Sequence, residues 1–142
     1  MVIAGIRQCS TADGPGKRFV LLLPGCQHHC TGCSASQGPG SGVEFPLDEL
    51  LEQMDSQPGL DGVTIAGGEP FDQAEDCAAL ARAVHSRGMT VRCHTGLTFS
   101  ALAASEDPAR LALLKETDVL VEPGCRILAA ESLAAGEILP ET

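Results

Sequence analysis

Three cysteines fall within eight consecutive residues, in the stretch GCQHHCTGC that runs from Gly25 to Cys33. Their spacing is C-x3-C-x2-C, and it is carried by Cys26, Cys30 and Cys33. Thiolates suit zinc and iron–sulfur clusters. A closed zinc site takes four protein ligands, and a closed iron–sulfur cubane takes four cysteines. Three thiolates therefore leave one metal position open, where an exogenous substrate or cofactor can bind and react.

Other interpretations of the cluster stay open at this point. His28 or His29 could complete a tetrahedral zinc site, although their position between the cysteines favours a role in shaping the loop. A disulfide framework is not expected, because the chain has an odd number of cysteines, seven, and shows no secretion signal. Cys77 and Cys93 lie in apolar, periodic stretches and are predicted to be small buried side chains rather than ligands.

Short apolar runs predict that the cluster follows a strand. Residues 18–23 (RFVLLL) form such a run, which ends at the turn signal Pro24-Gly25. Residues 62–66 (GVTIA) predict a second strand that leads directly into Gly67, Gly68, Glu69 and Pro70. Residues 89–93 (MTVRC) predict a third that leads into His94, Thr95 and Gly96, and residues 118–121 (DVLV) predict a fourth.

Helical spacing predicts helices between these strands. One spans residues 46–57, with Pro46 in its first turn, and another runs from Asp72, as N-cap with Glu75 as capping-box partner, to about residue 87. A short helix is expected after Thr98. A further helix opens at Asp107-Pro108, with Leu111 and Leu114 facing inward. The Ala- and Leu-rich tail from residue 126 predicts a last helix.

Strands that alternate with helices predict an α/β fold with a mainly parallel sheet. In such sheets ligands bind beyond the carboxyl ends of the strands. The cysteine loop, the Gly67–Pro70 turn and the His94–Gly96 turn are therefore expected at one rim. At 142 residues, without an internal repeat or linker, the chain is expected to form one domain.

Composition narrows the class of partner. The formal net charge of −10 argues against non-specific binding to nucleic acid and against an anionic membrane surface. No signal peptide is evident and no apolar run reaches ~18 residues, so a soluble cytoplasmic protein is expected. With four Phe and no Trp or Tyr, the core must be largely aliphatic.

The cysteine spacing after a strand resembles the cluster loop of the radical S-adenosylmethionine (SAM) superfamily. In that family three cysteines hold a [4Fe–4S] cluster, and SAM chelates the fourth iron through its amino and carboxylate groups. Gly67 to Pro70 (GGEP) looks like the family's GGE-type motif, which contacts the SAM amino group. Residues 13–18 (DGPGKR) resemble the DGPG-x-R stretch of glycyl-radical-enzyme activating enzymes.

Within that group the likeness is greatest to activases of the anaerobic ribonucleotide reductase, and it spans roughly residues 3–124. The stretch from Gly25 to Cys33 is similar to their GC-x3-C-x-GC loop, and residues 118–124 (DVLVEPG) are similar to their DVLVDG segment. His94-Thr95-Gly96 looks like their W-T-G turn, with His94 in place of an aromatic. Glu122 stands where the relatives have Asp, and Pro123 interrupts the segment, so the partner enzyme is left open.

The resemblance implies one radical SAM-like domain over residues 1–142, with its core at 3–124, the tail 126–142 unassigned, and a small, incomplete (open) β/α barrel. It implies that the metal ligands are Cys26, Cys30 and Cys33. It also implies six cofactor-binding residues, which are Gly67, Gly68, Glu69, Pro70, His94 and Thr95. No catalytic side chain beyond the cluster ligands is expected.

The implied activity is reductive cleavage of SAM at the cluster, which yields methionine and a 5′-deoxyadenosyl radical. That radical would install a glycyl radical on a partner such as the anaerobic ribonucleotide reductase, with flavodoxin or ferredoxin as electron donor. One alternative is a small radical SAM enzyme that acts on a metabolite or peptide. Another is a protein that is not an enzyme, either an iron–sulfur electron carrier or a zinc-binding module.

Overall fold

The computed structural model describes residues 1–11, 16–24, 42–122 and the main chain of 126–129. The three cysteines of the cluster, Cys26, Cys30 and Cys33, lie outside the described residues, as do residues 13–15 of the DGPG stretch. The described parts include the strand ends that precede the cysteine loop and the two other predicted turns.

A six-stranded sheet lies at the centre, in the order β2-β3-β5-β6-β7-β8. The four inner strands are parallel to one another, and the two edge strands run antiparallel to their neighbours. The predicted α/β class with a mainly parallel sheet is therefore confirmed. The strands are β2 (Gly5–Ser10), β3 (Arg18–Leu22), β5 (Gly62–Ala66), β6 (Thr90–His94), β7 (Val119–Glu122) and β8 (Arg126–Ala129). A separate two-stranded sheet pairs β1 (Val2–Ile3) with β4 (Val43–Glu44).

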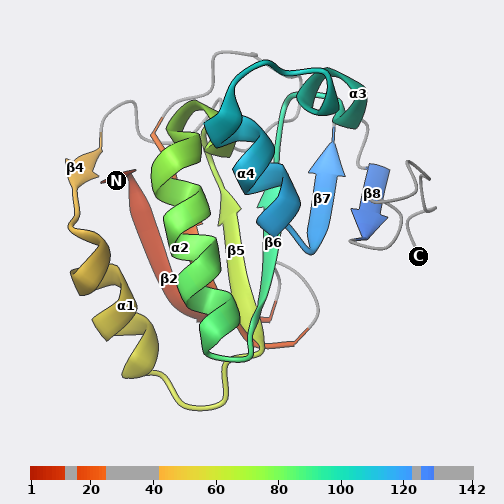
Figure 1. Ribbon diagram of the computed structural model, residues 1–142. Coiled ribbons are helices and arrows are strands. Elements are labelled where there is room, and N and C mark those ends of the chain that lie inside the picture. The colour runs from red at the N-terminus through yellow and green to blue at the C-terminus, as the bar shows by residue number, and fades with distance from the viewer. Residues whose placement is uncertain (12–15, 25–41, 123–125, 130–142) are drawn as a thin grey trace.

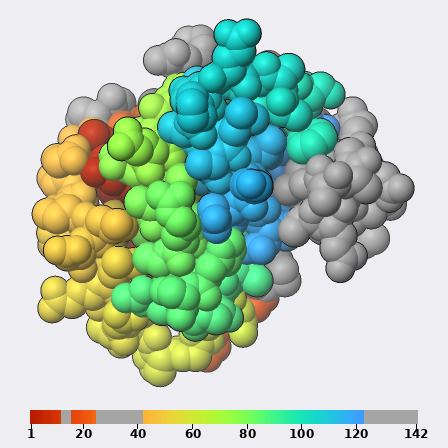
Figure 2. Space-filling view, viewed as in Figure 1, coloured from red at the N-terminus to blue at the C-terminus, as the bar shows by residue number. Residues whose placement is uncertain are grey.

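Helices cover one face of the large sheet. In Figure 1, α2 and α4 lie in front of the central strands, and α1 lies beside them toward the β2 edge. Figure 2 shows that side chains of these helices hide most of this face of the sheet. In the parts of the chain that the structure describes, every helix is too short or too polar to cross a lipid bilayer. The helices are α1 (Leu47–Asp55), α2 (Ala74–Ser86), α3 (Phe99–Ala103) and α4 (Pro108–Glu116), with a 3₁₀ helix, η2 (Pro70–Gln73), before α2.

The core lies between the helices and the sheet. Alternate residues of β3 and β5, among them Phe19, Leu21 and Ile65, point toward the helices and are fully buried. Burial of each such side chain stabilises the fold by about 1.5–3 kcal/mol. Cys77 of α2 and Cys93 of β6 are also buried there, which confirms that they are core side chains.

Arg18 lies on the opposite face of the sheet and joins three strands. Its side chain starts on β3 and donates to Thr64 Oγ1 (2.8 Å) and the Val63 carbonyl (2.9 Å) on β5, and to the Thr90 carbonyl (3.2 Å) on β6. Gly62 leaves room for this crossing, since a Cβ there would lie 2.6 Å from Arg18 Nη2. Burial, with a smaller effect of Arg92, lowers the pKa of the Arg18 guanidinium.

Two predicted helix starts differ from the structure. Asp72 does not cap α2, because it lies within η2, whose N-cap is Glu69, and α2 begins only at Ala74. Buried Glu69 satisfies the free N–H of Phe71, so the chain first forms a 3₁₀ turn. Pro46 is the N-cap of α1 rather than part of its first turn.

Two other predictions were wrong in the C-terminal half. Residues 126–129 form strand β8 instead of a helix, because the free edge of β7 offers them a ladder of backbone hydrogen bonds. Leu111 of α4 is exposed, and Leu113 occupies the inward position instead. The helix starts predicted after Thr98 and at Asp107-Pro108, by contrast, are confirmed, and the structure shows that both residues are N-caps whose side chains accept a hydrogen bond from the helix.

Candidate active site

The carboxyl ends of β5 and β6 meet at one rim of the sheet, joined by the side chain of Glu69. Its carboxylate accepts hydrogen bonds from Thr95 Oγ1 (2.8 Å), the Gly96 amide (2.7 Å) and the Phe71 amide (3.2 Å). Only 4% of Glu69 is exposed. The structure therefore brings the predicted GGEP and HTG turns into direct contact, as expected for loops that follow neighbouring parallel strands.

The turn at Gly67 also lies against the end of β3. Gly67 has a φ of 90°, and a Cβ there would lie 2.8 Å from the Leu23 nitrogen and 2.9 Å from its carbonyl oxygen. The Leu23 amide donates to the Ala66 carbonyl at 2.8 Å. Only glycine fits this conformation and this spacing. The main chain that leads toward Cys26 thus starts beside the GGEP turn.

Thr95 is buried within the rim. Its amide donates to the Val121 carbonyl of β7 (2.9 Å), and its hydroxyl accepts from the Leu97 amide (3.0 Å) while donating to Glu69. The side chain therefore holds the turn after β6 between β5 and β7. Pro70 is buried as well and begins η2 directly after Glu69.

His94 ends β6 on the face of the sheet away from the helices. Arg92, two residues earlier on the same strand face, donates from Nε to His94 Nε2 at 3.2 Å. This contact restrains the imidazole on that face of the sheet. The ring is thereby oriented at the predicted cofactor rim.

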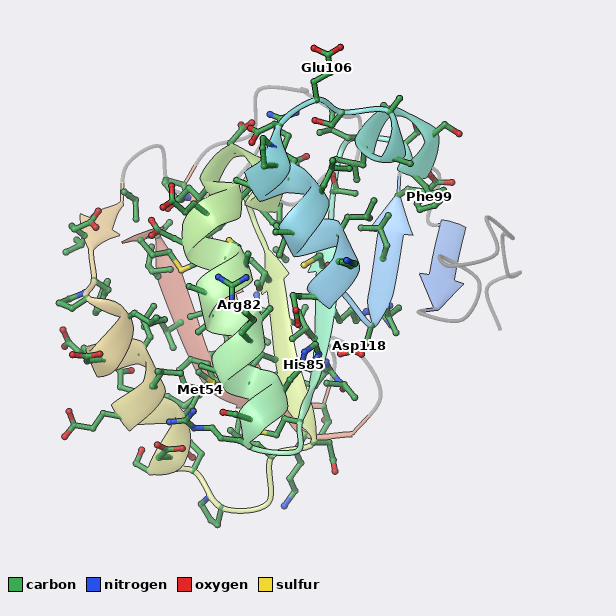
Figure 3. The ribbon with its side chains drawn as sticks, in the orientation of Figure 1. Met54, Arg82, His85, Phe99, Glu106 and Asp118 are labelled. Carbon is green, nitrogen blue, oxygen red and sulfur yellow. The ribbon has the colours of Figure 1, made fainter. Side chains whose placement is uncertain are left out.

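Glu122 is a buried rim carboxylate that sequence reasoning did not select. It ends β7, is 5% exposed, and accepts from the Phe99 amide at 2.8 Å. Figure 3 shows Phe99 beside the carboxyl end of β7, at the start of α3. The sequence feature that could have identified Glu122 as a rim residue is an acidic residue at the end of an apolar strand, followed by Pro-Gly. Glu69 and Glu122 together hold the segment from Thr95 to Phe99 from two sides.

A second group of charges lies at the other end of the sheet, away from the rim. His85 Nδ1 is 2.8 Å from Glu116 Oε2, and its Nε2 is 2.7 Å from Asp118 Oδ2. Figure 3 shows His85 and Asp118 together at the end opposite Phe99. Burial opposes the charged form, but the hydrogen bonds that His85 donates to the Asp118 and Glu116 carboxylates outweigh it and raise the pKa of His85. This cluster links α2, α4 and the start of β7 and is remote from the rim.

The two buried cysteines, Cys77 and Cys93, are poor metal ligands. Burial raises the pKa of the Cys93 thiol to about 12, although a hydrogen bond from Thr117 opposes the change, and burial raises that of Cys77 well above its ordinary value. Thiols bind metals as thiolates, so both are unsuited to the task. Across residues 1–11, 16–24 and 42–122, no group of three His, Cys, Asp or Glu side chains can hold a metal ion.

Comparison with known proteins identifies the family. The model of the 4Fe-4S single cluster domain matches residues 12–131. Pyruvate formate-lyase 1-activating enzyme of Escherichia coli (strain K12) is 30% identical over 128 residues, which cover 84% of this chain and 50% of the relative. The chain thus spans about half the length of that enzyme. The anaerobic ribonucleoside-triphosphate reductase-activating protein of Enterobacteria phage T4 is 30% identical over 125 residues, covering 82% of this chain and 76% of the relative. The anaerobic ribonucleoside-triphosphate reductase-activating protein of Salmonella typhimurium is 28% identical over 104 residues, which cover 66% of this chain and 68% of the relative.

The residues present fit the cofactors of this family. Three thiolates are the donors that an iron–sulfur cluster prefers, and they leave the open iron position that SAM requires. The backbone at Gly67 approaches Leu23, at the end of β3, without an intervening side chain. The cofactors are accordingly a [4Fe–4S] cluster and SAM. The chain belongs to the 4Fe-4S single cluster domain family and is a relative of the radical SAM activating enzymes of glycyl-radical enzymes.

Proposed function

We propose that the chain is a glycyl-radical-enzyme activase that cleaves SAM reductively and acts on a large protein partner, such as an anaerobic ribonucleotide reductase. One observation carries the proposal, which is the contact of the GGEP turn with both the end of β3 and the turn after β6. This arrangement supports the proposal because it places both turns, which we propose to bind the cofactor, beside the end of β3. When bound and reduced, the cofactor pair supplies the 5′-deoxyadenosyl radical that removes a hydrogen atom from the target.

In this proposal the chain's own residues bind and orient. Cys26, Cys30 and Cys33 hold three irons, and the turns from Gly67 to Pro70 and at His94-Thr95 lie along SAM. The sheet forms the incomplete β/α barrel of a single domain over residues 1–142, and a protein partner covers its open side. The electron donor is a flavodoxin or ferredoxin in the cytoplasm. The relatives, which are activating enzymes of glycyl-radical enzymes, support this assignment.

The first test is anaerobic. The cluster is reconstituted, SAM and dithionite are added, and 5′-deoxyadenosine and methionine are measured by chromatography. Formation of both, and their loss in the Cys30→Ala protein, is the expected result. Addition of a candidate reductase from the same genome should then produce a glycyl-radical EPR signal in the reductase. A wild-type protein that neither cleaves SAM nor changes its cluster EPR spectrum on SAM addition would refute the proposal.

A second candidate is a small radical SAM enzyme that acts on a metabolite or peptide. Glu122 and Pro123 favour it, because they depart from the segment of the activases that the sequence otherwise resembles. Glu122 reaches the Phe99 amide and so shapes the loop before α3. SAM cleavage that is stimulated by a small molecule, without a glycyl radical on any reductase, would favour this candidate.

A further inference from the structure

The carboxylate of Glu69 is the central hydrogen-bond acceptor of the rim. Oε2 accepts from Thr95 Oγ1 and the Phe71 amide, and Oε1 accepts from the Gly96 amide. These donors come from both sides of the gap between the ends of β5 and β6. A buried carboxylate is strongly destabilising unless it is hydrogen-bonded, and bonds to a charged acceptor are about twice as strong as neutral ones. The three contacts therefore fix the two turns relative to each other.

The hydroxyl of Thr95 is committed to the same contact. A threonine hydroxyl has one proton to donate, and Thr95 donates it to Glu69. The same oxygen accepts from the Leu97 amide. Thr95 therefore has no proton left to donate to a ligand, and its position is fixed from both neighbours in the rim.

We propose that Glu69 is a positioning residue, whose carboxylate sets the spacing between the cofactor-binding main chain at Gly67 and Gly68 and the turn that begins at His94. Thr95 is the hydrogen-bond partner through which Glu69 holds this turn, and in this proposal neither side chain contacts SAM. The inference rests on the proposed function, because the ligand being positioned is SAM. It differs from a direct contact of Glu69 with the SAM amino group, and the two can be separated.

Glu69→Gln is the informative variant, because it keeps the shape of the side chain. Whichever way the new amide lies, its NH₂ group faces a backbone N–H, either that of Phe71 or that of Gly96. Exchange of one of these two amides with solvent deuterium should therefore accelerate in the protein without SAM. A matched control is Asp55→Asn, which removes a carboxylate paired with Arg87 on the exposed surface. The control should leave both rim amides unchanged.

Affinity measurements separate positioning from direct contact. SAM and an analogue with hydrogen in place of the amino group are titrated into the cluster-loaded protein and followed by cluster EPR. Loss of one charge-assisted hydrogen bond predicts a weakening of roughly 10- to 100-fold. If Glu69 acts by positioning, Glu69→Gln weakens both ligands by the same factor. If Glu69 contacts the amino group, only SAM binding weakens, and the inference is wrong.

A double-mutant cycle tests the route through Thr95. Thr95→Val should weaken SAM binding about as much as Glu69→Gln does. The double variant should bind SAM no more weakly than either single variant, because both substitutions disrupt the same hydrogen-bonded contact. Thr95→Ser keeps the hydroxyl and should restore wild-type affinity. Additive effects, or a Thr95→Val protein that binds SAM normally, would overturn the inference while the SAM cleavage by the wild type still stood. A wild type that fails to bind SAM overturns the proposed function instead, and the positioning role falls with it.

Discussion

Replacing Gly62 by Ala should destabilise the protein, although strand propensity predicts the opposite. Alanine in a strand interior is favoured over glycine by roughly 0.5–1 kcal/mol. At Gly62, however, the added Cβ would lie 2.5 Å from the Thr90 carbonyl oxygen and 2.6 Å from Arg18 Nη2. The first is a backbone atom of the neighbouring strand, so it cannot move cheaply. The second belongs to a guanidinium that is itself buried and hydrogen-bonded.

The magnitude follows from these contacts. Overpacking of this kind destabilises by about 1–3 kcal/mol. Displacement of Arg18 from the Thr90 carbonyl removes a hydrogen bond of a charged group, for about another 1.5 kcal/mol. After subtraction of the propensity gain, the free energy of unfolding should fall by about 2.5 kcal/mol. Anaerobic urea titration, followed by far-UV circular dichroism at 25 °C, measures this quantity directly.

Gly5→Ala provides the matched control. Gly5 also lies in a strand of the same sheet, but its Cβ would meet the end of the flexible Leu22 side chain at 3.3 Å. Its unfolding free energy should stay within about 0.5 kcal/mol of the wild type. If Gly62→Ala matched this control or stabilised the protein, the packing of Arg18 across Gly62 would not be what holds β3, β5 and β6 together.

Three further predictions follow from the described contacts. His85 has a raised pKa, so its contribution to stability is complete below its unfolded pKa of ~6.5 and is lost as the pH rises through the folded value. In urea titrations between pH 5.5 and 9, His85→Gln should reduce the pH dependence of the unfolding free energy by about 1 kcal/mol. A pH dependence that the substitution leaves unchanged would contradict the assignment. Iodoacetamide at pH 8 should modify exposed Cys9 but reach buried Cys77 and Cys93 only after unfolding, as read by mass spectrometry. Asp107→Ala removes the N-cap carboxylate of α4, which accepts a hydrogen bond from the Ala109 amide at 2.9 Å, and should lower the unfolding free energy by about 1 kcal/mol. An unchanged urea midpoint would show that the cap is dispensable.

The inner strands and the rim were predictable from sequence because their signals are local. Residues 18–22 and 62–66 are short, largely apolar runs followed closely by proline or glycine, residues 90–94 have β-type residues ahead of the Thr95-Gly96 turn, and parallel strands gather their carboxyl ends by geometry alone. The burial of Cys77 and Cys93 followed from periodicity in the same way. The contact between Glu69 and Thr95 did not, because it joins residues 26 positions apart and depends on strand order.

The errors arose where tertiary contacts override local preference. By sequence, Asp72 and Glu75 match the capping-box pattern. In the structure Glu69 is the N-cap of η2, which begins before Asp72, and Asp72 instead forms an ion pair with Arg110 at 3.1 Å. The Ala- and Leu-containing residues 126–129 favour a helix by propensity, yet pairing with β7 decides their state. Strand β2 was missed because GIRQCS lacks an alternating apolar pattern, as befits a half-exposed edge strand.

The strand order of the large sheet has a consequence for folding. From β2 to β8, each strand of the sheet pairs with the next member of the sheet along the chain. Such sequential pairing avoids strand contacts between the two ends of the chain, which would be the slowest to form. The sheet can grow strand by strand during synthesis, and no strand has to wait for a partner from the far end of the chain. The rim that joins β5, β6 and β7 is then complete only once β7 has been added, so residues up to Glu122 must be made before Thr95 and Phe99 can reach their β7 partners.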